Sequence, residues 1–64
     1  MWTTIYLAMG LERATRVAER LEAEGFMVKK QFLWAEGDTE VYGILTPEFE
    51  ADEVQVVLFD LDIV

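Results

Sequence analysis

The stretch that decides the fold is FMVKKQFLWAEGDTEVYGILT, residues 26–46. Its first nine residues alternate between two faces, as in a half-buried strand whose first face looks inward except at Lys30. That face carries, in order, Phe26, Val28, Lys30, Phe32 and Trp34. Residues 35–38 supply a turn in which Gly37 can adopt a positive φ, and residues 39–46 have the composition of a second strand. The stretch therefore predicts a β-hairpin.

The residues before the hairpin predict a strand and a helix. Residues 2–8 are rich in aromatic and β-branched types, which favour a strand. After Gly10, apolar residues recur at helical spacing from Leu11 to Glu24, so we expect an amphipathic helix there. Gly25 stands where a left-handed C-cap is expected, and Phe26 follows as its hydrophobic contact.

The residues after the hairpin predict a second helix. Thr46, Pro47 and Glu48 have the pattern of a helix start, with a hydroxyl N-cap, a proline at the first helical position and then an acid. Helically spaced apolar residues follow at Val54, Val57, Leu58 and Leu61. Residues 56–64 could instead form a terminal strand, because Val, Phe and Ile favour strands and acids alternate with them. We favour a helix to about residue 60.

The expected order is strand, helix, strand, strand, helix, in one domain of residues 1–64. A right-handed crossover joins the first two strands, and the hairpin returns the third strand between or beside them. Both helices then cover one face of the sheet. We therefore predict an α+β fold built as a two-layer sandwich.

Three stretches together resemble a known family. They are MWTTIYLA (residues 1–8), LEAEGFMVK (21–29) and YGILTPE (42–48). They are similar to small bacterial proteins of unknown function, related to a domain described as a prokaryotic signal-transducing module. The resemblance covers most of residues 1–57 and implies a ferredoxin-like or PII-like fold lacking one strand. Some members carry the label glutamate decarboxylase, but 64 residues cannot enclose pyridoxal phosphate plus substrate, and the resemblance carries no catalytic residue onto this chain.

The residue types that are missing exclude the commonest active sites. The chain has no Cys, His, Ser or Asn, which excludes serine–histidine and cysteine–histidine nucleophiles and the usual zinc sites. Lys30 is a conceivable nucleophile on an apolar face, although its long stem can simply reach water. Four clustered acids could bind a hard cation, although the helix dipole also favours them at a helix start; they are Glu48, Glu50, Asp52 and Glu53. We expect no catalysis, no cofactor and no metal.

The charge of the chain is strongly negative and unevenly distributed. The net charge is −8, and residues 31–64 contain nine acids and no base. Such a chain repels phosphate, so we expect neither nucleic acid nor an anionic membrane as partner. No run of 18 apolar residues and no signal-peptide pattern is present, and we expect a cytoplasmic protein.

The predicted sheet has one face that the two helices leave uncovered. A chain of this size has a small core, and self-association is the remaining source of burial. We therefore expect that face, or the edge of the first strand, to form a homodimer interface, although single exposed aromatic residues are also ordinary on a monomer. The candidate interface residues are Trp2, Thr4, Tyr6, Leu33, Val41 and Leu45.

The turn at Gly10 is a second candidate site. Free backbone N–H groups at the start of a helix, next to the end of a strand, are a general position for an anion or nucleotide. The expected function is thus a non-enzymatic regulatory or protein-interaction module, and the alternative is a small-ligand sensor that uses the Gly10 turn. Capture of a protein partner would favour the first function, and ligand-dependent stabilisation the second.

Overall fold

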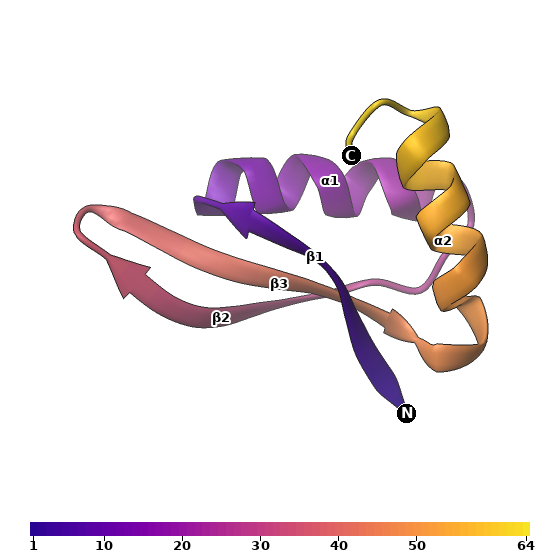
Figure 1. Ribbon diagram of the computed structural model, residues 1–64, viewed down its shortest axis with the longest axis horizontal. Coiled ribbons are helices and arrows are strands. Elements are labelled where there is room, and N and C mark those ends of the chain that lie inside the picture. The colour runs from indigo at the N-terminus through magenta and orange to yellow at the C-terminus, as the bar shows by residue number, and fades with distance from the viewer.

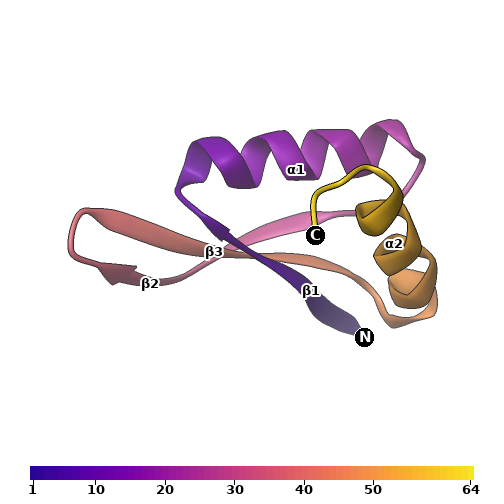
Figure 2. The same ribbon diagram turned by 45° about the horizontal axis from the view of Figure 1, so that its top comes forward.

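The computed structural model describes all 64 residues (Figure 1). Its elements are β1 (Trp2–Met9), α1 (Leu11–Ala23), β2 (Lys29–Glu36), β3 (Thr39–Pro47) and α2 (Glu48–Asp60). The strand order is β1-β3-β2, and β3 is antiparallel to both of its neighbours. Both helices lie on the same side of the sheet (Figure 2). The predicted α+β class, the β-α-β-β-α order and the ferredoxin-like arrangement lacking one strand are confirmed.

Helix α1 ends as its sequence predicts. Gly25 has φ 95°, and the N–H groups of Gly25 and Phe26 donate to the carbonyl oxygens of Glu22 and Leu21. This is the paired hydrogen-bond pattern of the Schellman motif, in which a residue without a Cβ takes the left-handed conformation at no steric cost. Phe26 then packs against the core, as expected for the hydrophobic contact of this motif.

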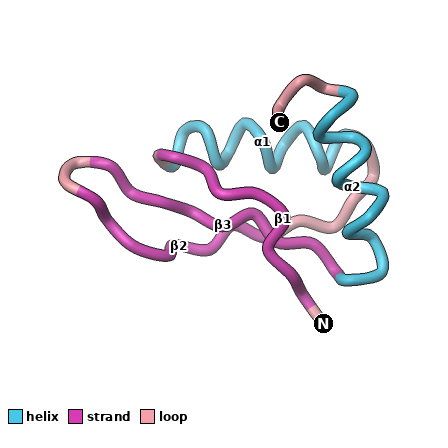
Figure 3. Tube along the Cα trace, in the orientation of Figure 1, coloured by secondary structure: helices cyan, strands magenta, loops and turns pink.

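Helix α2 ends in the same motif, but without a glycine. It continues to Asp60, so the helical interpretation of residues 56–60 is confirmed and the terminal strand is wrong. Asp62 takes the left-handed position with φ 64°, and the Ile63 N–H donates to the Leu58 carbonyl oxygen at 2.9 Å. Ile63 packs against the core and brings the last residues back toward α1 (Figure 3).

The start of α2 differs from the sequence prediction. Thr46 is not an N-cap: it lies in β3, pairs with Thr3 of β1, and its buried hydroxyl has no hydrogen-bond partner. Pro47 occupies the cap position, and α2 begins at Glu48. The reason is that β1 extends its pairing as far as Trp2 with Pro47. The Glu48 N–H then donates to the Met1 carbonyl oxygen at 2.8 Å, which replaces the side-chain cap.

The core lies between the sheet and the two helices. It is a cluster of seven buried residues, namely Ala8, Ala14, Val17, Leu21, Ile44, Val54 and Leu58. Helix α1 contributes a narrow stripe of small and medium side chains, and α2 crosses the end of the sheet. Only 12 of the 64 residues are buried, as expected for a chain too short to enclose a large core.

Two β-bulges decide which side chains face the helices. In β1 the pairing shifts between Thr4 and Tyr6, and in β2 it shifts between Phe32 and Trp34. Each bulge inserts one extra residue, so the alternation that holds on one side of it is reversed on the other. In residues 26–34, the side chains predicted to face inward do so as far as Phe32. The prediction is wrong for Trp34, which pairs with Val41 on the side away from the helices.

Candidate functional site

The side of the sheet away from the helices, which we call the open face, carries a mainly apolar set of side chains. Its rows follow from the strand register: Thr4 with Leu45 and Lys29, Leu7 with Gly43 and Gln31, and Met9 with Val41 and Trp34. Trp2 and Leu33 complete it. Leu33 belongs to this face because its Cδ1 lies 3.3 Å from the position that a Cβ on Gly43 would occupy.

The open face is apolar and largely uncovered. Val41 at its centre is fully buried, although it lies outside the core cluster between sheet and helices. Met9 and Trp34, which flank Val41, are 59 and 45 % exposed, and Leu7 in the next row is 50 % exposed. Adjacent exposed apolar side chains of this size are typical of an interaction surface, whereas scattered ones are not.

Five of the six predicted interface residues lie on the open face, and Tyr6 does not. The bulge in β1 turns Tyr6 toward the helices, where it packs against the core and pairs with Ile44. Its hydroxyl accepts hydrogen bonds from Arg13 Nε and Nη2 at 3.2 and 3.1 Å. The assignment of Tyr6 to the uncovered face is therefore wrong, because strict alternation from Trp2 does not continue through a bulge.

Sequence reasoning missed three residues of the open face. Leu7, Met9 and Trp34 come after the bulges, and regular alternation assigns Leu7 and Trp34 to the opposite side. Nothing in the local sequence marks either bulge, because both depend on pairing with β3, which lies far along the chain from β1.

The ends of the open face carry opposite charges. Lys29 Nζ lies 4.1 Å from the centre of the Trp2 ring, which is a cation–π contact. At the other end of β2, Glu36 pairs with Thr39 and falls on the same face by alternation from Val41. The face therefore has a basic end, an apolar middle and an acidic end.

The Gly10 turn has a structural explanation. Gly10 adopts φ 90° and ψ 148°, a region that is essentially restricted to glycine, and its N–H donates to the Glu40 carbonyl oxygen at 2.6 Å. The chain needs a glycine here to pass from β1 into α1. No pocket lies at this turn; the pocket of the molecule lies further along α1.

That pocket is an open groove of about 380 Å³ between α1 and the C-terminal segment. It is lined by Arg13, Arg16, Val17, Glu19, Arg20, Asp62 and Ile63. Three of the five basic side chains of the protein meet there. Arg16 Nη1 pairs with Glu12 Oε1 at 3.1 Å, while Arg20 has no hydrogen bond or ion pair within the chain. The groove thus combines three arginines with two acids, Glu19 and Asp62.

Lys30 and Glu50, two of the remaining titratable candidates, make contacts within the fold. Lys30 is exposed, and its Nζ donates to Thr15 Oγ1 of α1 at 3.2 Å. Glu50 Oε1 accepts the Met27 N–H at 3.1 Å. No group of three acids lies close enough together to hold a metal ion. A hydrogen bond to Glu40, together with burial and the charge of Glu40, raises the pKa of Tyr42.

The total exposed area of the chain is that of an ordinary monomer of its mass. What distinguishes its surface is the type of side chain that is exposed. A folded monomer of 7.4 kDa is expected to expose about 4,200 Å². This chain exposes 4256 Å², so it is as compact as a typical monomer. A binding surface is therefore indicated by the type and grouping of the exposed side chains, and not by the total exposed area.

Neither helix has the length and apolar character that crossing a membrane requires. In comparisons with known proteins, the chain matches no family model, no curated protein and no solved structure.

Proposed function

We propose that this chain is a cytoplasmic, non-enzymatic interaction or regulatory module that works as a homodimer, with a second copy covering the open face. The observation that carries this proposal is the group formed by Leu7, Met9 and Trp34 around the buried Val41. Burial of apolar area stabilises by about 25 cal/mol per Å², so covering these exposed side chains would add to the stabilisation that the core supplies.

The charges at the two ends of the open face favour a second copy as the occupant. If two sheets stack about a twofold axis that runs across the strands, Lys29 of one copy faces Glu36 of the other, and the apolar middles meet. A different protein would need the same arrangement of charges by coincidence. In a homodimer with twofold symmetry, each copy supplies both the basic end and the acidic end, so the charges are complementary by symmetry.

Sedimentation velocity of the purified protein at micromolar concentration tests this proposal. We expect a species of twice the 7.4 kDa chain mass, and we expect Leu7→Glu or Trp34→Glu to convert it to the monomer. Both side chains are about half exposed, so neither change removes part of the core. Phe59→Glu on α2 is the matched control and leaves the dimer intact. A wild-type protein that sediments only at 7.4 kDa would refute the proposal.

A second candidate function is a small-anion sensor, and the arginine groove on α1 favours it. Arg13, Arg16 and Arg20 stand on successive turns of one helix side, and guanidinium groups bind phosphate and carboxylate through paired hydrogen bonds. Isothermal titration calorimetry with pyrophosphate and with ATP tests it, with Arg20→Gln as the variant that weakens binding. Absence of heat with both anions would remove this candidate.

A further inference from the structure

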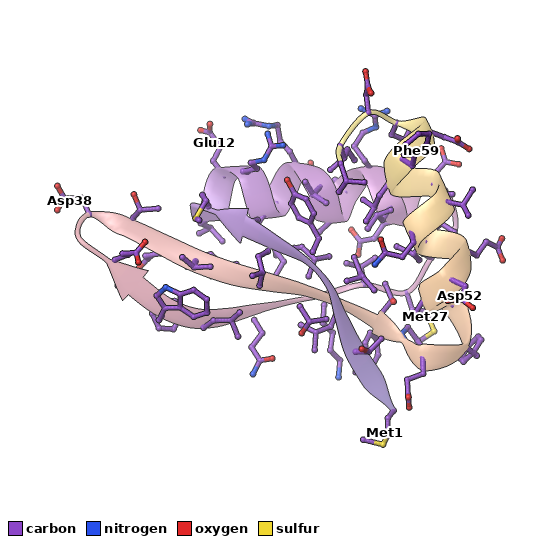
Figure 4. All side chains as sticks on the ribbon, viewed as in Figure 1. Met1, Glu12, Met27, Asp38, Asp52 and Phe59 are labelled. Carbon is purple, nitrogen blue, oxygen red and sulfur yellow. The ribbon has the colours of Figure 1, made fainter.

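The outer side of α2 carries three large apolar residues that the fold does not bury. Phe49, Val56 and Phe59 are 83, 59 and 72 % exposed. At roughly 100° per residue they fall within an arc of about 80°, opposite the buried Val54 and Leu58. They span about 15 Å of the helix axis. We call these three residues the α2 stripe; Figure 4 labels Phe59 in the last turn of α2.

The α2 stripe has no role within this chain. A surface helix normally has one apolar side, and α2 already has one that faces the core through Val54 and Leu58. A helix that is apolar on two sides is expected to be covered on both. The proposed dimer does not cover the stripe, because the open face lies on the other side of the sheet from both helices (Figure 2).

The charges around the α2 stripe restrict what can cover it. Asp52 falls within the arc of the stripe, and Glu53 and Asp60 border it. α2 contains no basic residue. A second copy that docked through α2 would bring acids against acids, and an anionic membrane surface would be repelled in the same way. A complementary surface has apolar anchors flanked by Lys or Arg.

The shape of the stripe favours a helix as the covering element. Its anchors lie along one side of α2 at spacings of seven and three residues, and side chains along one side of a helix pack into the grooves of another helix. We propose that the α2 stripe docks a basic amphipathic helix of another protein. Phe49 and Phe59 insert between the apolar side chains of that helix, and Asp52, Glu53 and Asp60 pair with its basic flanks.

The experiment measures binding of a fluorescein-labelled peptide of about 18 residues, with Leu on one helical face and Lys on the flanks, by fluorescence anisotropy. We expect saturable binding of one peptide per chain. Phe49→Ala and Phe59→Ala should each weaken it about tenfold, as for aromatic anchors at the centre of an interface. Raising the salt from about 50 to about 300 mM should weaken it further through screening of the acidic flanks.

The triple variant Phe49→Ala, Val56→Ala, Phe59→Ala keeps every charge of the protein. If it binds the peptide as tightly as the wild type, the attraction is electrostatic only and the proposal is wrong. A peptide with the same Leu pattern and Glu flanks should not bind, and equal binding would also overturn the proposal. Binding of the wild type to zwitterionic lipid vesicles, lost in the triple variant, would show that the stripe is a membrane contact instead.

Variants of the open face separate this proposal from the proposed homodimer. Leu7→Ala with Met9→Ala removes exposed apolar side chains of comparable size from the opposite side of the molecule, and peptide binding should not change. Loss of peptide binding in that variant, with retention in the α2 triple variant, would move the docking site to the open face. Far-UV circular dichroism checks that each variant is folded.

Discussion

Helices α1 and α2 each span 13 residues and end in the same hydrogen-bonded turn, but their outer surfaces are different. α1 buries one narrow side and exposes mainly charged residues on the other. α2 buries Val54 and Leu58 and exposes two phenylalanines and a valine on the opposite side. The pattern of α1 is accounted for by its own chain, whereas the outer side of α2 is left exposed by its own chain and is covered by a partner helix only in our proposal.

The largest expected effect tests whether the inner sides of the two helices are equivalent. Leu21 of α1 and Leu58 of α2 are both fully buried, so Leu21→Ala and Leu58→Ala should each cost about 3 kcal/mol of unfolding free energy. Urea denaturation at a fixed protein concentration measures this, since the proposed dimerisation would contribute to apparent stability. Val56→Ala, on the exposed side of α2, is the control and should change stability by less than about 0.5 kcal/mol. A comparable loss at Val56 would mean that its exposed side is already covered.

The C-terminal turn of α1 should be sensitive to the loss of its glycine. Gly25 has φ 95°, and a Cβ added to it would meet no atom within 4 Å, so Gly25→Ala introduces backbone strain without a clash. We expect a loss of about 1–2 kcal/mol, which urea denaturation would detect. An unchanged midpoint would show that residues 24–26 can end the helix in another way.

The start of α2 contains a defect that a substitution should repair. The Thr46 hydroxyl is buried and has no hydrogen-bond partner. Thr46→Val keeps the shape of the side chain and removes the unsatisfied group, so it should raise the free energy of unfolding by about 1 kcal/mol. Thr39→Val, at an exposed position in the same strand, is the control. Destabilisation by Thr46→Val would reveal a bonded hydroxyl, and with it a different start for α2.

The smallest expected effect compares the two helix ends directly. Asp62 of α2 occupies the left-handed position that Gly25 occupies in α1. Asp62→Gly relieves that strain and removes an acid from the negative end of the helix dipole, so we expect a gain of about 0.5–1 kcal/mol by thermal denaturation. A loss instead would mean that attraction between Asp62 and the arginines of the groove outweighs the strain.

Most of the architecture could be predicted from residues that act locally. The helical spacing after Gly10, the Gly25-Phe26 end of α1 and the turn at Gly37 each specify their element through backbone preferences that need no distant partner. The α2 stripe was not predicted, although Phe49, Val56 and Phe59 are left over once the core positions of that helix are assigned. The candidate interface was predicted as a face of the sheet, with five of its residues.

The sequence by itself determined the order of the elements, where α1 ends and the existence of an uncovered face. Only the tertiary structure decided which side chains occupy that face. The extra residues at Ile5 and Leu33 are set by pairing with β3, and a shift of one residue moves every following side chain to the other side of the sheet. The same long-range pairing drew Thr46 into β3 and moved the start of α2. Strand register is a property of two segments at once, so neither segment reveals it alone.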